Sequence, residues 1–66
     1  MKEQMWYFSF GSGQKPGLGW YAKYYGTYGT AREQMVADYN DKWSFQYDSA
    51  EACGVERFNL RCVNES

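Results

Sequence analysis

The chain has 66 residues, a formal net charge of −1, two cysteines and no histidine. A domain of this size buries only about 60% of the surface that its unfolded chain exposes, so little material is left to wall a deep catalytic cleft. Histidine is the usual general base at neutral pH, and two cysteines without it cannot complete a tetrahedral zinc site. The composition therefore predicts a non-enzymatic protein with no catalytic residue, no metal site and no cofactor.

Aromatic residues dominate the apolar part of the composition. Three Trp, seven Tyr and four Phe make up 21% of the chain, more than one small core can bury, so some rings are expected on the surface. The longest uncharged apolar runs, Met5–Phe10 and Leu18–Ala22, are far shorter than the roughly 20 residues of a membrane span. No basic start followed by an apolar stretch marks a leader. We therefore expect an intracellular protein with no membrane partner.

Two aromatic segments near the N-terminus are predicted to form an antiparallel hairpin. The segments are Met5–Phe10 and Trp20–Tyr25, and the Gly/Pro-rich stretch between them forms the loop. Side chains alternate between the two faces of a strand. The face expected to point inward carries Trp6, Phe8, Phe10, Trp20, Ala22 and Tyr24. The face expected to point outward carries Tyr7, Ser9, Tyr21, Lys23 and Tyr25.

A helix is predicted over residues 30–40. Thr30 and Glu33 match the T-x-x-E capping box, in which a hydroxyl and a carboxylate each accept a hydrogen bond from a backbone amide at the helix start. Asn40 is a residue type that adopts the left-handed conformation found after helix ends, so we place the end there. Helical spacing predicts a buried stripe of Ala31, Met35, Val36 and Tyr39.

Two strands and a short helix are predicted in the rest of the chain. Trp43–Asp48 alternates apolar and polar residues, which is typical of a strand with one buried face. A short helix over Ser49–Cys53 follows, capped by Asp48 and ended by Gly54. Arg57–Val63 alternates again and is predicted to be the last strand. The inward side chains of the two strands are expected to be Trp43, Phe45, Tyr47, Phe58, Leu60 and Cys62.

The predicted order is strand, strand, helix, strand, short helix, strand. This order is typical of one α+β domain over residues 1–66, in which a mostly antiparallel sheet of three to four strands carries one main helix on one face. The predicted core consists of Trp6, Phe8, Phe10, Met35, Tyr39, Trp43, Phe45, Phe58 and Leu60. Because its strand is taken as central, Phe45→Ala is predicted to cost roughly 3 to 5 kcal/mol and to unfold most of the protein.

Three further groups of residues carry candidate chemistry. The segment Gly11–Lys15 lacks the P-loop pattern and leads into a strand, so a hairpin loop with positive φ angles is favoured, with an anion or nucleotide site at Gln14 and Lys15 as the alternative. Cys53 and Cys62 are expected to be free thiols in a reducing compartment, with a disulfide as the alternative. Four carboxylates are interpreted as helix-end and capping groups: Asp38, Asp41, Asp48 and Glu51.

Three blocks of the sequence resemble a group of small proteins encoded by bacteriophages and prophages. They are the aromatic run that ends in Phe10-Gly11-Ser12-Gly13-Gln14, the helix segment Ala31–Met35 and the segment Asp41–Tyr47. The resemblance covers about residues 5–55, and the chain departs from the group in carrying Asn40 where Gly is common and in its Cys-containing last strand. The resemblance implies a phage accessory protein in the host bacterial cytoplasm. Small phage proteins of that kind often inhibit host enzymes, defence nucleases included, by binding them.

Tyrosines and one lysine are the candidate binding residues. The candidate site consists of Tyr7, Tyr21, Lys23, Tyr25 and Tyr28. Several tyrosines on the outer face of a hairpin form the kind of patch that is enriched at protein interfaces, although tyrosine is also an ordinary strand residue. With the resemblance, this patch predicts a protein that binds and inhibits a bacterial host protein through an aromatic sheet surface.

Two other partners stay open. The same tyrosines, with Lys15, Lys23 and Arg61, suit the stacking of single-stranded nucleic-acid bases, although a net charge of −1 disfavours it. A homodimer through the tyrosine face or through an open sheet edge is the other alternative.

Overall fold

The computed structural model describes residues 3–64 and confirms the α+β fold. Within these residues it contains four strands and two helices in the predicted order. Their bounds are β1 Gln4–Ser9, β2 Trp20–Gly26, α1 Tyr28–Tyr39, β3 Phe45–Tyr47, α2 Ala50–Cys53 and β4 Arg61–Cys62.

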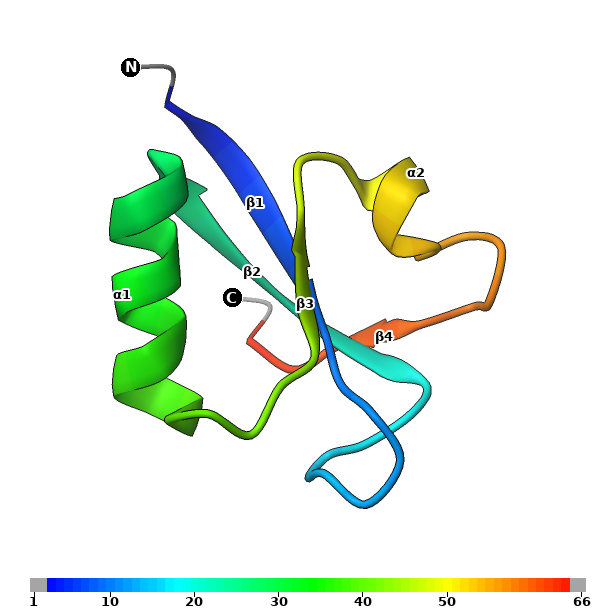
Figure 1. The fold of residues 1–66 in the computed structure, drawn as a ribbon. Helices are drawn as coiled ribbons and strands as arrows, with labels where there is room; N and C mark the ends of the chain where they lie inside the picture. Colours follow the sequence, from blue (N-terminus) through cyan, green and yellow to red (C-terminus); the bar gives the residue numbers. More distant parts are fainter. Residues whose placement is uncertain (1–2, 65–66) are drawn as a thin grey trace.

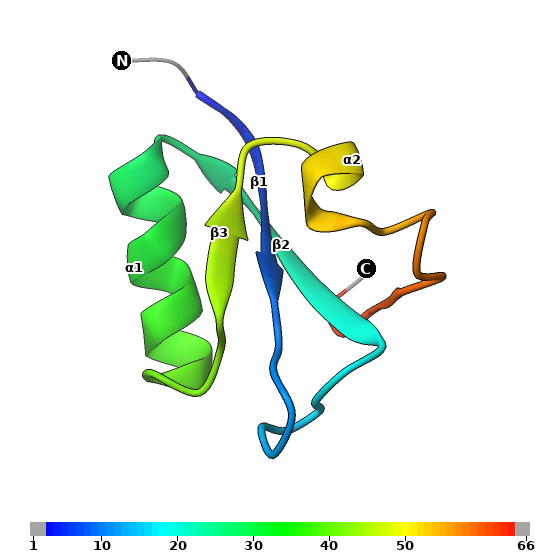
Figure 2. The ribbon, with the colours of Figure 1, turned by 45° about the vertical axis from the view of Figure 1, so that its right-hand side comes forward.

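The strands form one twisted sheet in the order β3-β1-β2-β4 (Figure 1). β1 pairs antiparallel with both β2 and β3, whereas β4 pairs parallel with β2. α1 packs on β1 and β2 from one side of the sheet, and α2 contacts β1 and β3 from the other side (Figure 1, Figure 2). We call the face turned away from α1 the second face. Because α2 has only four residues, it covers only part of that face.

The capping box of α1 lies three residues before the predicted one. The side chain of Thr27 accepts a hydrogen bond from the Thr30 backbone N–H at 3.2 Å, and the Thr30 hydroxyl accepts one from the Thr27 N–H at 2.8 Å. The helix therefore begins at Tyr28, and Thr30 is its third residue instead of its cap. Asn40 has a φ of 55° and ends the helix as predicted.

Two of the carboxylates near the helix ends, Asp48 and Asp38, differ from the prediction in what they do. α2 is capped by Ser49, whose side chain accepts a hydrogen bond from the Ala52 N–H at 3.0 Å, so the cap predicted at Asp48 is wrong by one residue. Asp38 is exposed, and its Oδ2 accepts a hydrogen bond from the Tyr24 hydroxyl at 2.5 Å. Burial, and then this carboxylate, raise the pKa of Tyr24, which keeps the phenol neutral as a donor that ties α1 to β2.

The core lies between α1 and the sheet. Phe8 and Met35 have no exposed surface, and the Phe8 ring makes edge contacts with Tyr24 and Trp43 at centroid distances of 5.8 and 5.2 Å. The buried cluster consists of Phe8, Phe10, Ala22, Tyr24, Ala31 and Met35. Partly buried rings that pack against it include Trp6, Trp20, Tyr39 and Trp43. The inward face predicted for the first two strands is confirmed at these positions.

Two predicted core residues are mostly exposed instead. Phe45 is 65% exposed, because β3 has only three residues and places Phe45 on the second face, whereas Trp43 precedes the strand and packs on Phe8. Phe58 is 63% exposed, because residues 54–59 form turns and the last strand has only two residues. Val36, predicted in the buried stripe of the helix, is 44% exposed.

Alanine substitutions at Phe8 and Phe45 form a matched pair that tests this core. We expect Phe8→Ala to lower the free energy of unfolding by about 3 to 5 kcal/mol, because it opens a cavity among packed rings. We expect Phe45→Ala to change it by about 0.5 kcal/mol or less, because the ring lies mostly in water. Circular dichroism melts at low protein concentration measure both values. A similar loss in the two variants would contradict the exposed position of Phe45.

Candidate partner-binding surface

The structure brings three of the predicted binding residues together on the second face. In the strand register, Tyr7 of β1 lies opposite Lys23 of β2, and Tyr21 lies opposite the neighbouring Ser9. The rings of Tyr7 and Tyr21 have centroids 6.0 Å apart. Lys23 is held in place through its backbone, because its N–H and C=O both bond the Asn64 side chain, at 3.0 and 2.7 Å.

The other two predicted tyrosines lie apart from this group. Tyr25, 60% exposed, is opposite Met5 at the far end of the β1–β2 pair, on the same face. Tyr28 is in the first turn of α1, and its ring makes an edge contact with Trp6 at 5.3 Å. Trp6 faces the helix, so Tyr28 lies on the opposite side of the sheet, and its predicted place in one tyrosine patch is wrong.

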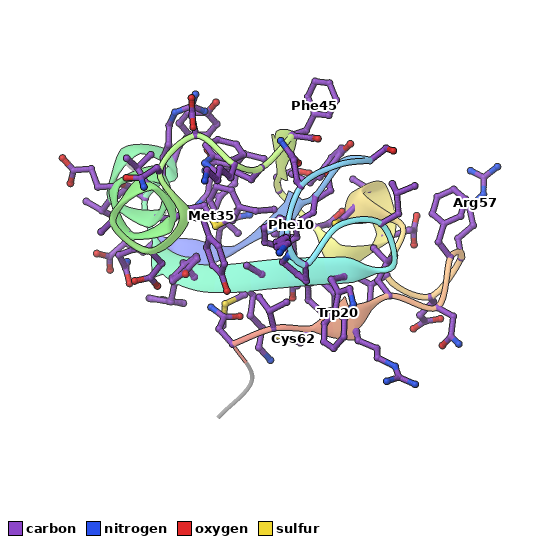
Figure 3. All side chains as sticks on the ribbon, turned by 90° about the horizontal axis from the view of Figure 1, so that it is seen from below. Phe10, Trp20, Met35, Phe45, Arg57 and Cys62 are labelled. Atoms are coloured by element: carbon purple, nitrogen blue, oxygen red, sulfur yellow. The ribbon has the colours of Figure 1, made fainter. Side chains whose placement is uncertain are left out.

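An apolar groove opens where α2 and the turn that follows it approach the start of β2. Its volume is about 410 Å³. Leu18 and Phe58 are 71% and 63% exposed, so both present apolar surface to water. Figure 3 shows Trp20 next to β4, the strand that pairs with the start of β2. The residues that line the groove are Ser9, Phe10, Leu18, Gly19, Trp20, Tyr47, Cys53, Phe58 and Leu60.

Gly54 and two arginines shape the walls of this groove. Gly54 ends α2 with a φ of 86°, and a Cβ there would lie 2.5 Å from the Phe58 ring, so only glycine lets the chain reverse and Phe58 pack against it. The Arg57 guanidinium lies 5.3 Å from the centroid of the Phe58 ring. The Arg61 guanidinium lies 5.9 Å from that of Trp20. Two of the aromatic rings that line the groove, those of Phe58 and Trp20, therefore each have an arginine guanidinium within cation–π distance.

Cys53 contributes a neutral thiol to the groove. Its side chain is 6% exposed, and burial raises its pKa to about 11. At neutral pH it is therefore protonated and behaves as a small apolar group. Cys53 and Cys62 are both free thiols, as predicted, and the Cys62 thiol donates to the Asn64 side chain at 3.3 Å.

The Gly-rich loop uses Gln14 to hold its own shape. Gln14 Oε1 accepts hydrogen bonds from the Gly11 N–H and from the Ser44 hydroxyl. A Cβ on Gly11 would lie 2.7 Å from Ser44 Oγ, so the loop packs closely on the segment before β3. Gly13 has a φ of 84°, which confirms the positive φ predicted for a hairpin loop. Lys15 is exposed beside Asp41, and these observations assign no ligand to it.

Comparisons with known proteins add nothing to this geometry, since no family model, no curated protein and no solved structure matches the chain. Over residues 3–64, the structure holds no group of three His, Cys, Asp or Glu residues that could bind a metal ion. In the same residues, no helix is both long and apolar enough to cross a membrane.

Sequence reasoning missed the groove because its two exposed apolar residues, Leu18 and Phe58, come from turns. Leu18 stands between two glycines, a position from which a side chain has few neighbours to bury it. That isolation is the one local signal that could have indicated an exposed apolar residue, and it did not enter the sequence-based prediction. Phe58 and Leu60 were assigned to the inner face of a strand, and only the turn after Gly54 places them beside Leu18.

Thiol labelling tests whether Cys53, which lines the groove, is buried in the folded protein. In the folded protein at pH 8, we expect iodoacetamide to modify Cys62 first, because Cys53 is buried and its pKa is raised to about 11. In guanidinium chloride, the two cysteines should react at similar rates. Mass spectrometry of peptides gives both rates, with Cys62→Ser as the control. Equal rates in the folded protein would show that Cys53 is accessible.

Proposed function

We propose that this chain is a non-catalytic binding protein that holds a partner protein in this apolar groove. The observation that carries the proposal is the apolar groove, whose lining includes the exposed Leu18 and Phe58 together with the partly buried Trp20 and Leu60. Clustered apolar surface of this kind is a mark of interaction sites, and aromatic residues with arginine are enriched in their centres.

The lining of the groove favours a protein over a small molecule. A small-molecule site has a few polar groups placed to fix one orientation, inside a cavity that covers most of the ligand. Here most of the lining side chains are aliphatic or aromatic, the hydroxyls among them are those of Ser9 and Tyr47, and the buried thiol of Cys53 is neutral. Tyr47 of the groove is opposite Tyr7 in the strand register, and the Tyr7 ring lies 6.0 Å from that of Tyr21. The aromatic surface therefore continues from the groove onto the second face, which suits a broad contact.

The sequence resemblance supplies the rest of the proposal. Because three blocks resemble phage-encoded proteins, we propose a bacterial host protein as the partner, bound in the cytoplasm and inhibited by the contact. A single-stranded nucleic acid is the competing ligand, since Lys23 lies beside Tyr7 and Arg61 lies over Trp20. The chain's net charge of −1 disfavours that ligand, because nucleic-acid binding depends on positive charge that neutralises phosphates.

Capture from a bacterial lysate tests the proposed function with a matched pair of surface variants. Leu18→Ser removes an exposed apolar side chain from the groove, and Val36→Ser removes one from α1 on the opposite side of the sheet. We expect wild type and Val36→Ser to retain the same stoichiometric protein. We expect Leu18→Ser to bind it about tenfold more weakly or worse, the effect of losing about 1.4 kcal/mol.

Two results would contradict this function. Equal capture by all three proteins would place the contact outside the groove. The second result is micromolar binding of labelled single-stranded DNA that falls steeply with salt and needs Lys23 and Arg61, which would favour the nucleic-acid alternative.

A further inference from the structure

β3 is an edge strand without the protection that edges usually carry. Within the described residues it pairs on one side only, with β1. Natural edge strands are commonly blunted by charged residues or proline, because an open edge offers its backbone groups to another chain. The five residues 43–47, Trp-Ser-Phe-Gln-Tyr, contain neither. The opposite edge, β4, carries the exposed charge of Arg61.

Some side chains around β3 form hydrogen bonds within the monomer, and others are exposed. Trp43 Nε1 donates to the Asn40 carbonyl at 2.9 Å, and Gln46 Nε2 donates to the Tyr28 carbonyl at 3.0 Å, so both act inside the monomer. The exposed residues of the segment are Lys42, Phe45 and Asp48. Figure 3 shows the Phe45 ring pointing away from the body of the molecule.

These three exposed residues are placed symmetrically in the sequence. Lys42 and Asp48 each stand three residues from Phe45, with opposite charge. β3 itself covers Phe45–Tyr47, and the proposed pairing extends over the flanking residues 42–44 and 48. If two copies of this segment pair antiparallel about a two-fold axis at Phe45, each Lys42 lies opposite Asp48 of the other copy. Opposite charges across a strand pair are stabilising, and like charges are destabilising. A register centred on Gln46 would instead place Lys42 opposite Ala50 and pair neither charge.

We propose that a second copy of this chain binds the β3 edge, giving a symmetric dimer with one continuous sheet. The segment 42–48 is complementary to itself, which is what a two-fold interface requires. Phe45 of each copy packs against the other across the axis, and the two Lys42–Asp48 pairs set the register. This dimer does not depend on the groove, because Leu18 and Phe58 lie outside the pairing segment.

Charge reversal tests the register as well as the dimer. Lys42→Glu places two carboxylates opposite each other, and Asp48→Lys places two ammonium groups opposite each other. The double variant Lys42→Glu/Asp48→Lys restores both pairs with the charges exchanged. Both residues are exposed, so each variant should fold, and circular dichroism checks this. Analytical ultracentrifugation over a wide range of concentration, up to near-millimolar, measures the mass.

The expected pattern is a dimer of 15.4 kDa, twice the chain mass of 7.7 kDa, for wild type and for the double variant, and monomers for the two single variants. Phe45→Ser should also be a monomer, whereas Val36→Ser should dimerise like wild type. Three results would overturn the proposal: wild type at 7.7 kDa at every concentration, single variants that dimerise like wild type, or a double variant that stays monomeric.

Discussion

Burial of Phe8 in the central strand is the contact on which the rest of this fold depends. β1 lies between β3 and β2, and Phe8 is opposite Ala22 on one side and Gln46 on the other. The small Ala22 side chain leaves room for the Phe8 ring, and Met35 of α1 is buried in the same cluster. Phe8 thus links three strands and the main helix. Among the residues of the four strands, it is the one aromatic side chain with no exposed surface.

The same arrangement leaves the second face poorly covered. A chain of 66 residues supplies one helix of 12 residues, which covers one face, and a helix of four residues for the other. Tyr7, Tyr21 and Tyr47 are half-buried on that face, Tyr25 and Phe45 are exposed there, and the groove forms where α2 ends. The exposed aromatic surface is therefore a consequence of size, because a domain this small cannot close two layers over its sheet.

Sequence patterns located the long elements and failed at the short ones. Alternation in β1 and β2 was right because six consecutive residue pairs hold the two strands in one register. β3 has three residues and β4 has two, which is too few for alternation to determine the face of each side chain. The direction of these side chains depends instead on three turns with positive φ, at Asn40, Gly54 and Asn59. Thus Tyr7, Tyr21 and Lys23 were placed together from the sequence, whereas the groove at Leu18 and Phe58 required the folded turns.

The two proposed surfaces meet at one side chain. Tyr47 lines the groove, and its ring centroid is 6.3 Å from that of Phe45, on which the dimer is centred. A second copy at β3 and a partner in the groove would therefore both fix the position of Tyr47. Two ligands that act on a shared group are linked, and each changes the affinity of the other by the same factor. If both proposals hold, the strength with which this small protein holds its partner would depend on the protein concentration, through the proposed dimer.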